Sequence, residues 1–327
     1  MRKISIIIGI FILLCLIYCN FAVAEPVTTH GIEHSLLQQV VVEPLLGKNL
    51  WRQVSIMDSN DKMAIPFFYN WHVYDKYDAP YPLGCGPLAV AQVMRFFEHP
   101  KTQLTSSAPE FEPLISKDFF VIINSKEIST KIIGGSGQYG SYNWGLMDIN
   151  PLPEYYQILS KDSPASPSSN SDPNTPQAKT RNETSSLLYD LGALMHVNYA
   201  MSGTGASDGK YFEDSASCTA LKKYLGYSSA QHRYFRINES IQNVLKSNLM
   251  IRHPVIMGCA SQLPNEQNMA EPIRSNHFFV VDGYGYINSG DRTEQTAYYH
   301  LNLGWGEGGY KDLWYPLSNF PVIVFVN

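Results

Sequence analysis

The stretch from Gly84 to Phe97, GCGPLAVAQVMRFF, predicts a helix that is buried on all sides. Its apolar side chains fall on nearly every face of the predicted helix, and a helix of that kind is stable only inside a core. The dipeptide His99-Pro100 predicts its end, because proline cannot continue a helix. The rest of the chain must therefore supply layers of structure that surround this helix.

The segments after this helix change in type along the chain. Residues 104–133 contain short strand-like runs, and residues 134–147 form a glycine-rich loop that leads into a helix or turn. Helices are predicted over residues 184–200 and 215–227. From residue 254 onward strand patterns dominate, in the stretches PVIMGCA, HFFVVDGYGY, AYYHLNLGWG and VIVFV. Helices early and an antiparallel sheet late predict one α+β domain.

Two sections show neither pattern. The tyrosine-rich section that ends at Pro82 is interpreted as loop. Residues 159–182 are rich in Ser, Pro and Asn, which predicts a flexible surface insertion rather than a linker between domains.

The composition excludes several classes of protein. Of the 327 residues, 44% are hydrophobic and 16% are charged, which is typical of a globular chain with a sizeable core. The formal net charge is −5 and no long basic run is present, so a dedicated nucleic-acid-binding function is not expected.

The first residues have the pattern of a targeting segment. Arg2 and Lys3 precede an apolar run that ends at Tyr18, and Ala22-Val-Ala24 is a small-x-small cleavage site. We predict a signal peptide over residues 1–24, cleaved after Ala24, and a secreted or periplasmic protein with no stable membrane span after cleavage. An uncleaved anchor is an alternative, although the run is short of the ~20 residues that a span needs. A lipid-modified Cys19 is another, although Tyr18 is bulky for that signal.

Three cysteines remain after such cleavage, Cys85, Cys218 and Cys259. An odd number in an exported protein leaves at least one thiol outside any intramolecular disulfide. Whether Cys218 and Cys259 pair is left open.

Cys85 lies between glycines at the predicted start of the buried helix, where the helix dipole favours a thiolate and first-turn N–H groups can bind an oxyanion. Gly84 and Gly86 would let a substrate backbone approach closely. A buried structural cysteine is the alternative.

A nucleophilic cysteine needs a base, and His277 has the most suitable setting among the histidines. It opens a predicted strand whose hairpin partner ends at Asn302 and Trp305, so both are expected near it. Asn302 would hold the imidazole tautomer by accepting from its N–H, and Trp305 would exclude water. This is the arrangement that a Cys–His nucleophile requires. His99, His253 and His300 are interpreted as surface histidines of loops or strands.

Together these segments resemble the streptopain-like secreted cysteine peptidases of the papain-like group. GCGPLAVAQVMRFFEHP is similar to the family's catalytic stretch, and SNHFFVVDGY with YYHLNLGWGEGGYKD is similar to its histidine hairpin and Asn-x-Gly-Trp-Gly ending. VVVEPLLGKNLWRQ resembles the start of the family's mature domain, whose glutamine completes the oxyanion hole at the position of Gln53. The resemblance spans roughly Val40 to Asp312.

The resemblance implies a papain-like α+β fold in which a helix carrying Cys85 packs against a sheet carrying His277. It implies a catalytic domain over residues 40–327, preceded by a short leader over residues 25–39. The insertion expected from composition at 159–182 lies within this domain. The resemblance also implies a protein or peptide substrate, with roles for Asn302 and Gln53. Weaker expectations place further residues along the substrate cleft: Gly84, Gly86, Asn276, Trp305, Gly203 and Gly205. For the loop that holds Gly203 and Gly205, a plain surface turn is the alternative.

The chain departs from the family pattern in three respects. A folded inhibitory pro-domain has no counterpart in residues 25–39, a tryptophan position is occupied by Leu303, and the glycine-rich loop near the family's C-terminus is missing. Regulation by a separate protein inhibitor is therefore one expectation.

No cofactor is expected, because no cysteine or histidine pair has metal-ligand spacing. A Cys–His peptidoglycan amidase and an inactive peptidase-like binding protein are the alternative functions.

Overall fold

The computed structural model describes the chain from residue 31 to residue 326 with internal gaps. The residues outside the description in that span are 48, 54–64, 78, 80, 102–115, 138–139, 149–157, 160–173, 201–204, 207–215, 236, 261–274, 289–294, 305–312 and 318–322. Among the described residues, no helix combines the length and apolar character needed to cross a membrane. The predicted signal peptide, residues 1–24, lies outside the described residues.

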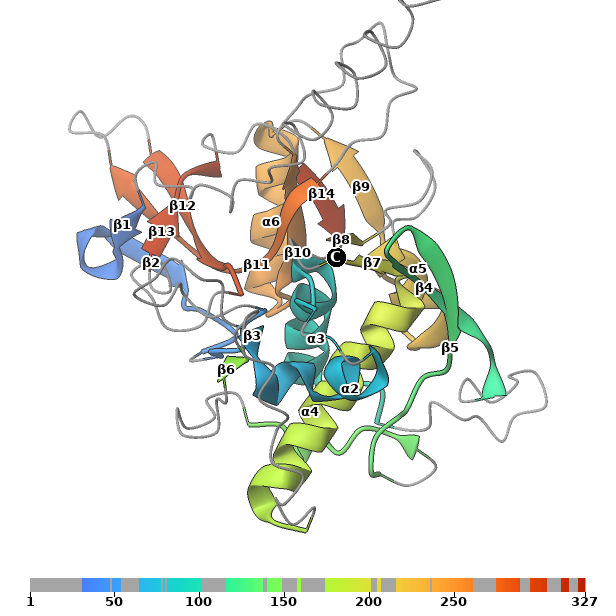
Figure 1. The fold of residues 1–327 in the computed structure, drawn as a ribbon. Helices are drawn as coiled ribbons and strands as arrows, with labels where there is room; N and C mark the ends of the chain where they lie inside the picture. The colour runs from blue at the N-terminus through green and yellow to red at the C-terminus, as the bar shows by residue number, and fades with distance from the viewer. Residues whose placement is uncertain are drawn as a thin grey trace, which may run out of the picture.

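An eight-stranded sheet forms one half of the molecule (Figure 1). Its strand order is β1-β13-β12-β11-β10-β14-β9, and β2 pairs with β11 beside this path. Neighbouring strands in it are antiparallel. The bounds are β1 Ile32–Glu33, β2 Gln39–Val42, β9 His232–Phe235, β10 Val255–Ala260, β11 Ser275–Asn288, β12 Gln295–Asn302, β13 Leu313–Tyr315 and β14 Ile323–Val326.

Helices dominate the other half, where α2, α3 and α4 lie close together (Figure 1). The bounds are α2 Phe67–Tyr77, α3 Cys85–Phe97, α4 Pro176–Leu194 and α5 Ala216–Tyr224, while α6 Glu239–Met250 packs against the main sheet. A smaller sheet has the order β5-β4-β7-β8. The remaining elements are β3 Ile65–Pro66, β4 Phe119–Ile123, β5 Lys126–Thr130, β6 Ile158–Leu159, β7 Val197–Tyr199, β8 Gly205–Ala206 and the 3-10 helices η1 His34–Leu36 and η4 Trp144–Leu146.

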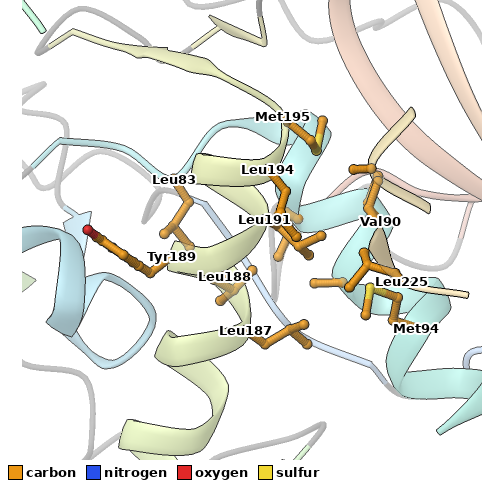
Figure 2. Close-up of a cluster of buried hydrophobic side chains, with 14 of the residues drawn as sticks. Leu83, Val90, Met94, Leu187, Leu188, Tyr189, Leu191, Leu194, Met195 and Leu225 are labelled. Carbon is orange, nitrogen blue, oxygen red and sulfur yellow. The ribbon is translucent and has the colours of Figure 1, made fainter. Parts of the chain in front are cut away.

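The main sheet separates two hydrophobic cores because successive strand residues point to opposite faces. Phe278 and Val280 of β11 belong to the core that contains α3, α4 and α5. Phe279 and Val281 of the same strand belong to the core beneath α6. Figure 2 shows how leucines of α4 meet side chains of α3 inside the first core. The helix predicted from its apolar faces is thus enclosed, and its residues from Gly86 to Met94 are all buried.

Most of the element predictions are confirmed. The helix expected from Gly84 begins at Cys85 with Gly84 as its N-cap, and helix α5 lies inside the predicted range 215–227. The four strand stretches predicted after residue 254 correspond to β10, β11, β12 and β14. Helix η4 lies near the end of the stretch 134–147, after its glycine-rich part, as expected.

The prediction of loop before Pro82 is wrong for residues 67–77, which form α2. This helix is held by packing against α4, since Val73 is buried and Tyr77 stacks on Tyr189 with ring centroids 6.2 Å apart. The guanidinium of Arg181, on α4, lies 4.1 Å from the ring centre of Trp71.

Helix α4 differs from its prediction at both ends. It begins at Pro176, inside the expected insertion 159–182, because the Thr175 hydroxyl caps it by accepting from the Ala178 N–H at 3.2 Å. It ends at Leu194, because β7 pairs with β4. At the other side of the expected insertion Leu159 lies in β6, and residues 160–173 fall outside the described residues.

The surface interpretation of His300 is wrong. Its side chain is buried, and Nδ1 lies 2.6 Å from Oδ1 of the buried Asp282. The polar imidazole ring is tolerated in the interior because the Asp282 carboxylate accepts a hydrogen bond from it. His253 is exposed as expected. His99 is half-buried, and its ring centroid lies 4.8 Å from that of Tyr227.

The described part of the expected leader, residues 31–39, contributes to the main sheet. Ile32 and Glu33 of β1 pair with Trp314 and Leu313 of β13. The Gln38 N–H donates to the carbonyl of Tyr286 at 3.0 Å, and β2 begins at Gln39. A boundary between leader and domain at residues 39 and 40 stays a prediction, and residues 25–30 lie outside the description.

Candidate active site

Cys85 is the first residue of α3, and its side chain is half-buried and not in a disulfide. Gly84 precedes it with φ of 91° and ψ of 141°, a conformation that a residue with a Cβ rarely adopts. Pro87 is accommodated because N–H groups in the first turn have no acceptor within the helix. The main-chain N–H groups of Cys85 and Gly86 belong to that same turn, where the helix dipole favours negative charge.

His277 lies in β11 and is only 6% exposed. Its Nε2 is 2.9 Å from the main-chain carbonyl oxygen of Leu303. Because a carbonyl can only accept, Nε2 carries the hydrogen of this bond, and in the neutral ring Nδ1 is then the nitrogen with the lone pair. Burial lowers the pKa of His277 to about 4, and the bond to Leu303 opposes that shift only in part. The ring also stacks on Phe279 with centroids 6.2 Å apart.

One face of α3 is turned toward the strand end that holds His277. Cys85, Leu88 and Gln92 share this face, because residues three and seven apart align on a helix. Leu88 packs so closely on Gly304 that a Cβ at Gly304 would lie 2.7 Å from the Leu88 Cδ2. The Gln92 Nε2 donates to Oδ1 of Asn302 at 3.0 Å. Leu303, whose carbonyl accepts from His277, lies between Asn302 and Gly304 in the chain. The face of α3 that begins at Cys85 therefore packs against the segment that orients His277.

Asn302 ends β12 and makes three hydrogen bonds with its side chain. Its Oδ1 accepts from Gln92 and from the Gly304 N–H at 3.1 Å. Its Nδ2 donates to the main-chain oxygen of Asn49 at 3.0 Å. The sequence predicted that Asn302 accepts directly from His277. In the structure both lone pairs of this oxygen are used by other donors, and the carbonyl of Leu303 is the acceptor for the imidazole.

Gln53, the predicted oxyanion residue, lies beside the same strand end. Its main-chain N–H donates to the carbonyl oxygen of Gly304 at 3.2 Å. The segment before it is fixed as well, since the Trp51 N–H donates to the Asn49 side chain and the Trp51 indole donates to the main-chain oxygen of Asp148. Trp51 itself is fully buried.

The weaker cleft predictions have mixed positions. Gly84 and Gly86 flank Cys85 at the start of α3, and Asn276 precedes His277 in β11. Gly205 lies in β8, a strand that contacts α3. Trp305 and Gly203 fall outside the described residues.

Three groups were missed by the sequence reasoning: the main-chain carbonyls of Leu303 and Asn49, and the side chain of Gln92. A signal existed for Gln92, because it is a polar residue in a helix that is otherwise apolar on nearly all faces and it is 1% exposed. The contact of Leu303 has no such signal, since a carbonyl is present at every residue.

Metal ligands do not gather among the described residues, where no group of three or more His, Cys, Asp or Glu side chains is placed to bind an ion.

Comparison with known proteins gives a consistent result. The model of the peptidase C10 family matches residues 65–315. The solved structure of active wild-type interpain A cysteine protease from Prevotella intermedia superposes with a TM-score of 0.54 at 18% identity, covering 91% of this chain and 98% of that chain. A fragment of prointerpain A from the same organism, with a cysteine-to-alanine substitution, gives a TM-score of 0.48 at 16% identity, covering 90% of this chain and 75% of that chain. No curated protein sequence matches significantly.

The predicted papain-like α+β fold is confirmed by the mixed helix and antiparallel sheet architecture and by the likeness to interpain A.

Proposed function

The chain belongs to the peptidase C10 family and is a cysteine-type peptidase, and from this premise we propose that Cys85 is the nucleophile, His277 the general acid and base, and Gln53 part of the oxyanion hole of an exported endopeptidase. The observation that carries the proposal is the bond from His277 Nε2 to the Leu303 carbonyl. This bond leaves Nδ1 as the basic nitrogen of the ring. The strand end that holds His277 in this way packs against the face of α3 that begins at Cys85.

The proposed reaction begins with the proton of the Cys85 thiol moving to Nδ1 of His277. A thiolate at a helix N-terminus is stabilised by the dipole, and the imidazolium that faces it is stabilised in turn. Because burial lowers the pKa of His277 to about 4 despite the bond to Leu303, the charged ring depends on this partner. The two groups are therefore expected to titrate as a coupled pair.

The thiolate then attacks the carbonyl carbon of the scissile peptide bond. The resulting oxyanion is stabilised by the Cys85 N–H and the Gln53 side-chain amide. His277 gives its proton to the leaving amine as the C–N bond breaks, which leaves a thioester on Cys85. Water next attacks the thioester with His277 as base, and the acid product departs as the thiolate is restored.

Asn302 has an indirect role in this proposal. It fixes the strand end from which Leu303 orients the imidazole, rather than contacting the ring itself. The bonds from Asn302 to Gln92, Gly304 and Asn49 support that role.

The test of the nucleophile is Cys85→Ala, assayed on casein together with labelling by a thiol-directed epoxide. We expect Cys85→Ala to lose both turnover and labelling while its melting temperature stays close to that of the parent, since one small residue replaces another. Cys218→Ala is the matched control. Cys218 is fully buried in α5, so this variant keeps the active site and should retain both signals. Turnover of casein by Cys85→Ala at the parent rate would refute the assignment.

Export is the second part of the proposal and rests on the residue pattern of positions 1–24. The mature protein recovered outside the cytoplasm of an expressing cell should begin at Glu25. N-terminal sequencing decides this, and recovery of the intact N-terminus with the membrane fraction would show an anchor instead. Digestion of casein but not of purified cell wall separates the peptidase from an amidase.

A further inference from the structure

We propose that Gln92 is a positioning residue, and that with Asn302 it forms an amide node that sets the geometry between Cys85 and His277. This inference rests on the proposed roles of those two catalytic residues. The node consists of the side chains of Gln92 and Asn302, together with their partners Asn49 and Gly304. It joins three separate stretches of chain.

Each stretch that meets at the node carries one group of the proposed active site. Gln92 lies two turns after Cys85 on the same face of α3. Asn302 directly precedes Leu303, whose carbonyl accepts from His277. The Asn49 carbonyl accepts from the Asn302 amide, four residues before Gln53. A displacement at the node therefore moves the nucleophile, the base and the oxyanion donor relative to one another.

The chemistry of Gln92 supports a positioning role over a packing role. The residue is 1% exposed in a helix whose neighbouring core positions are Ala91, Val93 and Met94. Its Oε1 is buried and, among the residues that the structure describes, has no hydrogen-bond partner, a cost that a leucine or methionine of similar size would avoid. What the amide of Gln92 provides, and an apolar side chain would not, is the hydrogen bond from Nε2 to Asn302.

The node is also rigid on the side of Asn302. Both lone pairs of Oδ1 are used, by Gln92 and by the Gly304 N–H, and Nδ2 donates to Asn49. Gly304 has φ of +68° and lies against Leu88, so the chain can make this turn next to α3 only with glycine. The strand end is thus fixed to the helix by one apolar contact and one hydrogen bond.

The experiment replaces Gln92 by methionine, which keeps the length of the side chain and removes its donor. We expect kcat to fall about 10- to 100-fold with KM nearly unchanged, because a displacement of about 1 Å in a reacting pair has effects of that size. The rate of Cys85 alkylation by iodoacetamide, measured against pH, should shift its midpoint upward toward the ~8.5 of an ordinary thiol.

Met94→Ala is the matched control for lost stability, because Met94 is fully buried on the same helix and is not one of the four residues of the amide node. It should lower the melting temperature and leave kcat and the alkylation profile of the folded enzyme unchanged. If Gln92→Met behaves like Met94→Ala in both readouts, the positioning role is refuted.

Gln92→Glu supplies a second, isosteric variant. Burial raises the pKa of a carboxyl, so at pH 6 this side chain should be protonated and able to donate to Asn302. Turnover relative to the parent should be largely restored at pH 6 and fall by pH 9. A ratio that stays constant between these pH values overturns the proposal, and this comparison decides even if Gln92→Met does not fold.

Failure of the inference and failure of the proposed function are distinguishable. Retained casein turnover by Cys85→Ala would remove the catalytic pair. Loss of turnover in Cys85→Ala, together with unchanged kcat in Gln92→Met, would leave the pair intact and remove only the node.

Discussion

In the helical half of the molecule, Cys85 begins a helix that is surrounded by apolar side chains of α4 and the region around α5 (Figure 2). In the sheet half, His277 is held through hydrogen bonds of strand ends, at Leu303, Asn302 and Gly304. Packing is non-directional and tolerates small changes of shape, whereas hydrogen bonds fail when a donor or acceptor is lost.

The difference separates stability from alignment. Apolar truncation in the helical half should cost folding free energy and leave the geometry of the folded enzyme intact. Small polar changes in the sheet half should cost turnover more than folding.

The largest effect is expected from His277→Ala in the sheet half. Turnover of a peptide substrate should fall by about 10³-fold or more, because the residue transfers protons in both steps. The bell-shaped pH dependence of kcat/KM should disappear with it. His253→Ala is the control, since His253 is exposed and outside the site. Asn302→Ala should cost less, because it acts through Leu303; a greater loss from Asn302→Ala than from His277→Ala would overturn the assigned roles.

Leu191→Ala tests the helical half. Leu191 is fully buried between α4 and α3, and truncation there should lower the free energy of unfolding by about 2–5 kcal/mol. Epoxide titration of one aliquot counts the active sites, and the turnover of an untreated aliquot divided by that number should give an unchanged kcat. Lys179→Ala, at an exposed position of the same helix, should change neither quantity. A large drop in turnover per site for Leu191→Ala would break the contrast between the halves.

Asp190 gives the helical half a pH response of its own. Burial raises its pKa from 3.8 to about 7, although it accepts from the Ile133 and Gly134 N–H groups and the Tyr142 hydroxyl. The folded protein therefore binds this proton more tightly than the unfolded chain does. Its contribution to stability is full below pH ~4 and is lost as the pH rises toward 7, by up to about 4 kcal/mol.

Asp190→Asn should flatten that part of the stability curve, as measured by denaturant unfolding from pH 4 to pH 8 in a Cys85→Ala background that cannot digest itself. An unchanged slope would show that the carboxyl stays ionised through its three donors.

In the sheet half, burial of His277 should make the free energy of unfolding depend on pH in the opposite direction. In a Cys85→Ala protein, where no thiolate faces the ring, its folded-state pKa of about 4 lies below the usual 6.5 of histidine, so the unfolded chain binds the proton first as the pH falls. Stability should fall between pH 6.5 and 4 by up to ~3 kcal/mol from this group. His72, with a pKa also lowered to about 4 by burial, contributes in the same window. His277→Gln in the same Cys85→Ala background should remove part of the acid slope, and an equal slope in both proteins would contradict the prediction.

The smallest effect is expected at the start of α4. Thr175→Ala removes the hydroxyl that accepts from Ala178 and should cost about 1 kcal/mol of unfolding free energy. Thr175→Ser keeps the cap and serves as the control. An effect on turnover per active site would show that the two halves are coupled through α4.

Sequence patterns predicted elements whose local signal agrees with their packing. The buried helix α3 and the β11–β12 hairpin are of this kind. Helix α2 was missed because its aromatic residues favour strands, and its helical state depends on contacts such as Tyr77 on Tyr189. Helix α6 had a readable signal: Asn238 caps it by accepting from the Ile241 N–H, and its core residues recur as Ile241, Leu245 and Leu249.

The candidate site was predictable where side-chain chemistry carries the role. Cys85 and His277 stand out by residue type and setting. The part played by Leu303 was not predictable, because its main-chain carbonyl acts and its side chain packs in the α6 core. His300 was misjudged because its partner, Asp282, lies across the hairpin near a register shift between Val281 and Gly283, which a simple alternating pattern does not reveal.

The pairing of β1 with β13 and of β2 with β11 has a consequence for the order of folding. Ile32 meets Trp314, and Val42 meets Tyr284, so these ladders join positions that are far apart along the chain. Contacts of such long sequence separation form late, because a large loop must close before they contribute. The strand that carries His277 is thus completed on both sides only when almost the whole polypeptide is present. A nascent chain still being made would hold its thiol without a finished catalytic sheet, and peptidase activity would begin with the closing of the fold.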